Sequence, residues 1–332
     1  MHGCTPDNIP PEILCSHEPL ILKNLVSSWP LVKLSETSAN STVDYLKKFY
    51  QGQPIGAFTA KPEINGRYFY QHDLSQLNFC KQYSQLDTLL DKLLEQLSEQ
   101  IDEKRVPGIY VGSAHVDQLL PGFRSENDLS ALSKFKPLMS IWLSNQSRIA
   151  AHHDVPNNIA CCITGKRRFT LFPPEQLENL YIGPLDNTPA GQAVSLVDFH
   201  QPDWVKFPKF EKALQQAQVA ELDAGDALFL PSMWWHHVES LSSFNILVNY
   251  WWQTTSSHMG APIDAMMHAL LNIKNLPHEQ KEAWFEMFKY YIFNNDTTAL
   301  SHIPNEQLGV LNPMDDKSSR QIRSMLLNKL NK

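Results

Sequence analysis

Short runs of aromatic and β-branched residues, separated by turn signals, dominate residues 106–258. The turn signals include Asn-Asn, Thr-Gly-Lys and Ala-Gly-Asp. Runs of this length and composition are typical of an antiparallel β-sandwich or barrel. We therefore expect strands in GIYVG, LMSIWLS, NIACCI, RFTLFPP, DALFLP and FNILVNYWW.

Helical periodicity flanks this β region on both sides. Residues 1–105 form a mixed lead that we expect to pack on the core. It has one helix capped by Ser41 or Thr42 and another over 85–102, where leucines and Ile101 recur at helical spacing. Residues 259–332 return to apolar positions at helical spacing. The pattern predicts a mainly β protein with α: a helical lead, a β core and a helical tail.

Composition narrows the class of protein. Hydrophobic residues make up 42% and charged residues 19% of the 332 residues, as in soluble globular enzymes. The formal charge of −7 makes a broad nucleic-acid surface unlikely by charge alone. No apolar run is long enough for a membrane helix, and the N-terminus does not resemble a signal peptide. Five scattered cysteines, two of them adjacent at 161–162 on opposite faces of an expected strand, favour the cytoplasm.

A His-x-Asp pattern gives the first chemical lead. In a strand, His152 and Asp154 point the same way and His153 points the other way. Two histidines and one carboxylate are the ligands of non-haem iron(II) oxygenases, which keep the remaining metal positions open. The pattern alone is weak evidence, since His115 and Asp117 form a second match.

The segment GDALFLPSMWWHHVE, residues 225–239, offers a third ligand. Its buried strand ends at a bend that leads to His236 and His237, which we expect at the rim or interior of a barrel. Spacing alone does not choose between the two histidines. Both could instead be satisfied polar residues of an aromatic core.

Three segments carry a family resemblance: HHDVPNN (152–158), GKRRFTLFPP (165–174) and GDALFLPSMWWHHVES (225–240). Together with the opening segment 18–32 they resemble the cupin-like Jumonji-C family, nearest to its asparaginyl hydroxylases and bacterial cupin-like members. The resemblance implies a double-stranded β-helix, a jelly-roll variant. It implies His152, Asp154 and His236 as catalytic metal ligands, with His237 structural. Iron(II) and 2-oxoglutarate follow as cofactor and co-substrate.

The co-substrate needs a cation for its distal carboxylate. Strand parity places Arg167 on the same face as Phe169 and Leu171, so Arg167 points inward if they do. The alternative is that Lys166, Arg167 and Arg168 form a solvated turn. Arg167 departs from the lysine frequent in the family, and Ile149 replaces a threonine that hydrogen-bonds the co-substrate there. The resemblance further implies that the co-substrate pocket is lined by Tyr110, Asn158, Asn249 and Trp251.

The implied activity is that of a 2-oxoglutarate-dependent dioxygenase, which converts 2-oxoglutarate and O2 to succinate and CO2. We expect hydroxylation of a protein or peptide side chain. A small molecule or a tRNA base is an alternative substrate, although the acidic charge makes nucleic acid less favoured. A cupin metal-binding protein without oxygenase activity is the rival from another class. The resemblance also implies a homodimer through the C-terminal helices, which could otherwise cover the open end of the β core.

Overall fold

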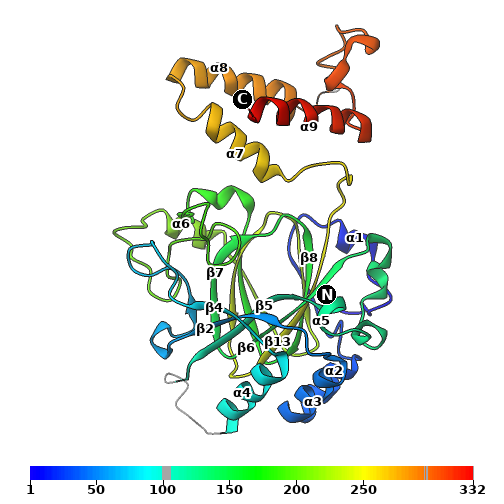
Figure 1. Ribbon diagram of the computed structural model, residues 1–332, viewed down its shortest axis with the longest axis vertical. Coiled ribbons are helices and arrows are strands. Elements are labelled where there is room, and N and C mark those ends of the chain that lie inside the picture. Colours follow the sequence, from blue (N-terminus) through cyan, green and yellow to red (C-terminus); the bar gives the residue numbers. More distant parts are fainter. Residues whose placement is uncertain (99–105, 295, 297, 332) are drawn as a thin grey trace. The chain divides into compact units, whose positions relative to one another are not determined.

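The computed structural model describes residues 1–98, 106–294, 296 and 298–331 (Figure 1). The chain divides into two compact units, residues 1–253 and 254–332. The boundaries expected at 105/106 and 258/259 remain predictions. The strands of the first unit are β1 (Leu20–Leu22), β2 (Ile55–Ala60), β3 (Arg67–Tyr68), β4 (Cys80–Ser84), β5 (Gly108–His115), β6 (Leu138–Ser144), β7 (Ser147–His153), β8 (Asn157–Thr164), β9 (Arg167–Phe172), β10 (Gln218–Leu222), β11 (Ala227–Leu230), β12 (Trp235–Ser240) and β13 (Asn245–Trp252).

These strands form two sheets. The larger has the order β1-β11-β8-β13-β6-β5-β2-β4 and the smaller the order β10-β9-β12-β7-β3. All pairs are antiparallel except β3 with β7. The alternation of sheets along the chain, with β7 and β9 in one sheet and β8 between them in the other, is that of a double-stranded β-helix, as predicted.

The larger sheet separates two apolar clusters by strand parity. On β8, Ile159, Cys161 and Ile163 pack in the main core outside the barrel. Ala160 and Cys162 face the other way, into a smaller cluster between the sheets. The adjacent cysteines therefore lie on opposite faces, as predicted, and both are free thiols.

Helices cover the outer face of the larger sheet. They are α1 (Pro11–Leu14), α2 (Pro30–Thr37), α3 (Ala39–Phe49), α4 (Leu86–Ser98), α5 (Val116–Leu119) and, near the smaller sheet, α6 (Phe210–Gln215). Val32, Leu46 and Leu90, from α2, α3 and α4, join the main core. Short 3-10 turns connect the elements: η1 (Pro62–Ile64), η3 (Phe123–Ser125), η4 (Ser130–Phe135) and η5 (Pro174–Leu177).

One detail of the lead differs from expectation. The cap of α3 is Ser38, whose Oγ accepts the backbone N–H of Ser41, so this helix begins before the predicted Ser41 or Thr42. Ser38 caps the helix because its extended backbone leaves its hydroxyl facing the N–H groups of the first turn. The predicted helix over 85–102 is observed as α4, while Ile101 lies outside the described residues.

A further strand, β12, was not predicted. The segment after Pro231 was expected to bend into the two histidines, yet Trp235–Ser240 pairs with both β7 and β9. His236 is thus the second residue of a strand rather than a residue just beyond a strand end. Polar residues are buried on both faces of β12, with His237 and Glu239 on one of them. Their burial hides the alternation of apolar and polar positions by which a strand is predicted.

The second unit is helical, as the tail pattern predicted. It comprises α7 (Pro262–Asn272), α8 (His278–Phe288) and α9 (Asp316–Leu330), with a π-helical turn η6 (Lys289–Phe293) and the 3-10 turns η7 (Asn305–Gln307) and η8 (Gly309–Leu311). Neither α7 nor α8 contains a buried residue. Across the described part of the chain, no helix is both long and apolar enough to cross a membrane.

Candidate metal centre

The three predicted metal ligands lie close together at the paired strands β7 and β12: His152, Asp154 and His236. His152 and His236 are direct cross-strand partners, and Asp154 follows the end of β7. Their ligand atoms all lie within 4.8 Å of one another. The His236 Nε2 is 3.7 Å from the Asp154 Oδ2, and the two imidazole centroids are 4.3 Å apart. The structure therefore brings together all three residues predicted as ligands.

Backbone carbonyls orient both imidazoles. Nδ1 of His152 lies 2.9 Å from the carbonyl oxygen of Ala150, and Nδ1 of His236 lies 3.0 Å from that of Trp234. A carbonyl only accepts, so each Nδ1 carries the proton and donates it. The lone pair of each ring is then on Nε2, on the side of Asp154. Fixing the tautomer in this way is how proteins present histidine to a metal.

A bulge in β7 brings about this geometry. Ile149 pairs with Val238 and His152 with His236, so Ala150 and Ala151 together oppose one residue of β12. Ile149 and His152 both face inward as a result, although three positions separate them. Ala150, whose carbonyl holds His152, lies in this bulge.

Electrostatics favour neutral imidazole at His236. Burial, followed by the neighbouring His152, lowers the pKa of His236 to about 4. Its lone pair is therefore available at neutral pH. Asp154 accepts a hydrogen bond from the Trp251 Nε1 at 3.1 Å, which fixes one carboxylate oxygen. Two imidazole nitrogens and one carboxylate oxygen that lie close together suit iron(II) with open positions.

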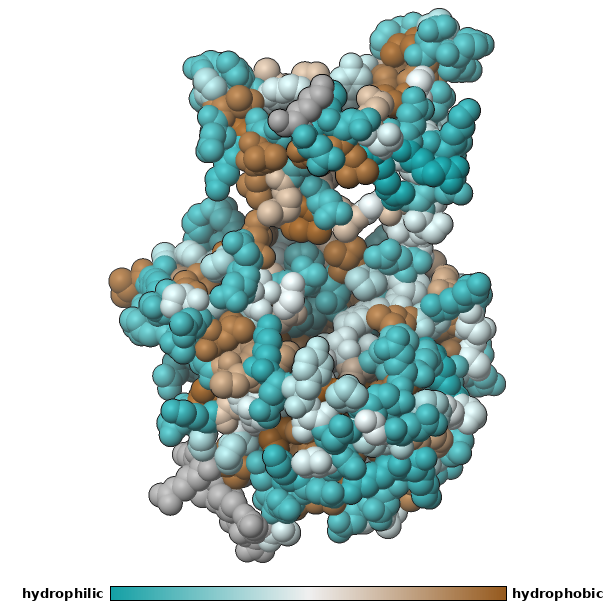
Figure 2. All heavy atoms as spheres, in the orientation of Figure 1, coloured by the Kyte–Doolittle hydropathy of each residue, from teal (hydrophilic) through white to brown (hydrophobic). Residues whose placement is uncertain are grey.

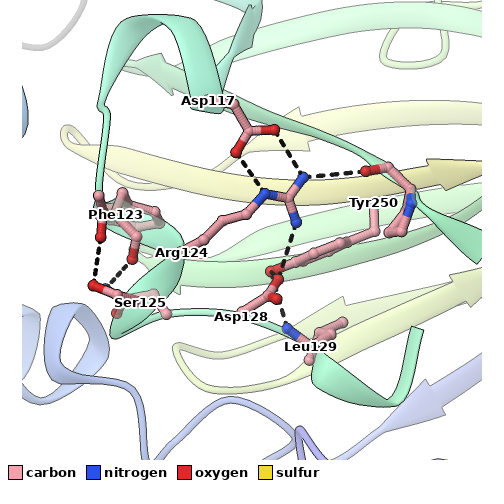
Figure 3. A network of polar contacts seen from close by, with 10 residues as sticks. Asp117, Phe123, Arg124, Ser125, Asp128, Leu129 and Tyr250 are labelled. Atoms are coloured by element: carbon pink, nitrogen blue, oxygen red, sulfur yellow. Dashed lines mark hydrogen bonds and ion pairs between the residues drawn. The ribbon is translucent and has the colours of Figure 1, made fainter. Parts of the chain in front are cut away.

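The second His-x-Asp match does not form such a group. Asp117 binds Arg124 through two contacts, 2.6 Å to Nε and 3.2 Å to Nη2, as Figure 3 shows. Arg124 also reaches Asp128 at 3.1 Å, and Tyr250 donates its hydroxyl to the same carboxylate. Asp117 thus belongs to an ion-pair network that ties the segment after α5 to β13.

The histidines beside the centre point away from it. His237 is buried and stacks on Phe199 with ring centroids 4.4 Å apart. Burial, followed by His200, lowers the pKa of His237 to about 3. His153 faces Trp235 at 4.6 Å, on the outer side as parity predicted. Strand pairing thereby distinguishes His236 from His237, which spacing had left open.

A polar chain lines the barrel beyond the metal ligands. Asn249 donates to the Asn158 Oδ1 at 3.3 Å and accepts from the Trp142 Nε1 at 2.7 Å. The Trp142 ring lies 5.9 Å from Trp251 and 6.1 Å from Tyr110. Trp142 was missed in the sequence. The alternation along β6 could have identified it. Met139, Ile141 and Leu143 pack in the outer core, so Trp142 must face the other side of the sheet.

Arg167 is a buried cation with two unsatisfied nitrogens in the described part of the chain. Its side chain faces the barrel with Phe169 and Leu171, which lie in the inner cluster. Nε and Nη2 find no hydrogen-bond acceptor among the described residues. Burial lowers its pKa, with the neighbouring Cys162 and Tyr110 acting in the opposite direction. An unpaired buried guanidinium is costly unless an anion binds it. Arg167 therefore faces inward as parity predicted, and the alternative of a solvated turn does not hold for it.

An aromatic cluster includes Tyr110, which is close enough to both Arg167 and Asp154 for their charges to act on its pKa. Tyr110 is buried, and burial raises its pKa, so its phenol stays protonated and can donate. The Tyr68 ring lies 5.2 Å from the Tyr110 ring, and its buried hydroxyl has no partner in the described part of the chain. Tyr68 was also missed, because its two-residue strand is too short to show a period. Ile149 packs against this cluster.

Comparisons with known proteins agree with this architecture. A family model described as "Cupin-like domain" matches residues 6–258. The chain is 34% identical over 122 residues to lysine-specific demethylase JMJ31 of Arabidopsis thaliana, covering 36% of this chain and 22% of that protein. It is 33% identical over 132 residues to tRNA wybutosine-synthesizing protein 5 of Mus musculus, covering 40% and 36%. HSPB1-associated protein 1 of Homo sapiens is 31% identical over 116 residues, covering 34% and 23%.

These matches span well under half of each relative's own length. A solved structure, that of E. coli ycfD, aligns over 98% of this chain and 68% of that chain at 12% identity. Its TM-score of 0.41 is too low to support an argument. The family model, in contrast, covers nearly the whole first unit, including both sheets and the three clustered ligands. The chain therefore belongs to the cupin-like domain family, in agreement with the Jumonji-C resemblance of its motifs.

Proposed function

We propose that this protein is an iron(II)- and 2-oxoglutarate-dependent oxygenase that hydroxylates its substrate. The observation that carries the proposal is the buried Arg167, whose Nε and Nη2 have no acceptor among the described residues, inside the barrel that also holds the His-Asp-His cluster. A metal site alone would fit many cupins. A buried cation that lacks an anion fits a dicarboxylate co-substrate, whose other end can reach the metal.

Each residue has a distinct role in this proposal. His152, His236 and Asp154 hold iron through Nε2, Nε2 and a carboxylate oxygen. Trp251 keeps the carboxylate oriented through its 3.1 Å hydrogen bond. Arg167 pairs with the distal carboxylate of 2-oxoglutarate, and Tyr110 can donate to the same group. When bound, iron and 2-oxoglutarate together supply the activation of O2 that no side chain provides.

The barrel interior also orients the co-substrate and excludes water from it. Asn158, Asn249 and Trp142 form a fixed polar wall, so the co-substrate meets groups that need no rearrangement. The rings of Tyr68, Tyr110 and Trp142 exclude water from the pocket interior. Asp154 occupies the carboxylate position that, by the family resemblance, favours hydroxylation or demethylation over halogenation.

The first test measures 2-oxoglutarate binding and turnover in a pair of neighbouring variants. Arg167→Met removes the inward cation, whereas Arg168→Met removes an outward one that pairs with Glu221. Loss of the carboxylate pairing is worth about 1.5–3 kcal/mol, so Arg167→Met should weaken 2-oxoglutarate binding about tenfold or more. Arg168→Met should bind normally. Equal behaviour of the two variants would contradict the assigned pocket.

The second test separates an oxygenase from a cupin that only binds metal. Purified protein with iron(II), 2-oxoglutarate and O2 should form succinate, and His152→Ala should lose both metal and succinate formation. His153→Ala, which changes the adjacent outward ring, serves as the control. Metal binding without any succinate would favour the non-oxygenase cupin. Unchanged metal content in His152→Ala would exclude the site itself.

For the substrate we propose a protein or peptide side chain. A relative named as a lysine-specific demethylase supports a protein substrate. Relatives named as tRNA wybutosine-synthesizing protein 5 favour a tRNA base as the second candidate, which the net charge of −7 makes less favourable. Mass spectrometry of a peptide library and of bulk tRNA, searching for the gain of one oxygen atom, distinguishes the two. A gain in tRNA alone would overturn the peptide proposal.

We further propose that the second unit joins two copies of the chain. Apolar side chains gather on the surface of its helices, where Figure 2 shows brown patches. Leu271 is 72% and Phe285 62% exposed, and neither helix that carries them buries a residue. Large contiguous apolar surfaces are characteristic of interaction sites. The family resemblance makes a second copy the expected occupant, and light scattering of the full chain measures it.

A further inference from the structure

A groove of about 970 Å³ lies apart from the metal ligands, none of which lines it. It is lined by residues of η1 and β3, by the β6–β7 turn and by the segments that follow Val197 and Val238. Arg148 and His152 pair with Glu239 and His236 of β12, which are three positions apart, so roughly 10 Å of strand separates the groove from the metal ligands. Volumes of this size accommodate small-molecule ligands.

Two arginines lie side by side in this groove. Arg67 on β3 and Arg148 on β7 are register partners of the parallel strand pair. The backbone enforces their proximity: Arg148 donates its N–H to the Gly66 carbonyl at 2.7 Å. Gly66 has a φ of +72°, and a Cβ there would lie 2.9 Å from the Gln146 carbonyl oxygen. Only glycine allows this close approach, so the arginine pair is held rigidly.

One carboxylate serves both guanidinium groups. Each oxygen of Asp198 lies 3.4 Å from one arginine, Oδ2 from the Arg67 Nη1 and Oδ1 from the Arg148 Nη1. Arg148 also donates its Nε to the Asn65 carbonyl at 3.2 Å, and the Arg67 guanidinium lies 3.9 Å from the centroid of the Phe69 ring. The Arg67 Nη2 is buried and has no hydrogen-bond partner among the described residues. Burial lowers the pKa of Arg67, as expected for a cation that is incompletely paired.

The charged side chains that line the groove balance in number, three cations (Lys61, Arg67 and Arg148) against three carboxylates (Glu63, Asp198 and Glu239). Glu239 is buried and engaged by His200, with Arg168 at 3.7 Å. Lys61 and Glu63 are both exposed and contribute one charge of each sign. His237, packed beneath the pair, is neutral because its pKa is about 3. What the groove lacks among the described residues is therefore an acceptor for the buried Arg67 Nη2.

We propose that Arg67 and Arg148 form a second anion site, which binds the phosphate or carboxylate group of a small molecule in this groove. Two guanidinium groups fixed side by side can bind an oxyanion through paired N–H donors, the geometry at which arginine exceeds lysine. The anion would accept from the Arg67 Nη2, and it would compete with Asp198 for the other guanidinium donors. This site is separate from Arg167, which faces the barrel interior, and does not depend on the oxygenase activity.

Calorimetric titration of the full chain with inorganic phosphate tests the proposal. Wild-type protein should bind phosphate saturably. Arg148→Gln should bind about tenfold or more weakly, the effect of losing one charged hydrogen-bond donor. Arg320→Gln, which removes the same charge from α9, should bind like wild type. Acetate is titrated in parallel. The anion that binds more tightly, phosphate or acetate, then indicates whether the natural ligand carries a phosphate or a carboxylate.

Two further variants distinguish loss of the anion site from misfolding and from binding at Arg167. Asp198→Asn removes the competing carboxylate and should tighten phosphate binding at least severalfold, a gain that misfolding cannot imitate. Arg167→Met should leave this binding intact. The proposal is overturned if wild-type protein shows no saturable binding, if Asp198→Asn binds no better than wild type, or if Arg167→Met alone abolishes binding.

Discussion

The Trp251 indole is a positioning group whose removal has a calculable effect on metal affinity. Trp251→Phe retains an aromatic ring against Trp142 but removes the 3.1 Å donor to the Asp154 Oδ2. A hydrogen bond to a charged acceptor contributes about 1.5–3 kcal/mol. The Asp154 side chain is 18% exposed, so water can replace part of this contact and the lower value applies. About 1.5 kcal/mol corresponds to roughly tenfold weaker metal binding.

Anaerobic titration with iron(II), followed by calorimetry, measures this change. The neighbouring Trp252 offers a matched control, because its indole Nε1 is buried without a partner in the described structure and its ring packs in the outer core. Trp252→Phe should alter stability and leave metal affinity as in wild type. Refutation would come from Trp251→Phe binding iron as tightly as wild type, or from Trp252→Phe losing affinity equally.

Four further predictions concern other parts of the chain. Tyr250→Phe should cost about 1–3 kcal/mol in urea unfolding, because Leu129 N–H loses a buried acceptor; Tyr290→Phe, which loses a surface bond to Ala299, should cost far less. Gly66→Ala should destabilise the protein by about 1 kcal/mol or more beyond Gly191→Ala, since both glycines have positive φ but only Gly66 is confined; equal costs would refute the confinement. The double variant Leu271→Asp and Phe285→Asp should convert a dimer to a folded monomer in light scattering, and a wild-type monomer would exclude the interface. His115→Ala should leave the iron content of the protein unchanged, because Asp117 is paired with Arg124 and does not form a metal site with His115. A loss of iron would show that the second His-x-Asp pattern contributes to metal binding.

The parts of the fold that were predictable are those where burial follows strand or helix periodicity. Arg167 was predicted to face inward because Phe169 and Leu171 share its parity, and its burial confirms this. β12 escaped prediction because His237 and Glu239 are buried polar residues on its outer face. The choice between His236 and His237 depends on register with β7, a long-range pairing that no local pattern contains. Tyr68 and Trp142 likewise reach the pocket only through sheet closure.

The bulge in β7 has a consequence for how this protein tolerates insertion and deletion. A regular strand would send Ile149 and His152 to opposite faces, whereas the extra residue at Ala150 or Ala151 resets the phase between them. Removing a single alanine would leave the composition of the site intact and the chain almost the same length. It would nevertheless turn either the metal ligand or the pocket wall to the outside. One residue without functional atoms is thus as necessary to the geometry of the centre as its ligands.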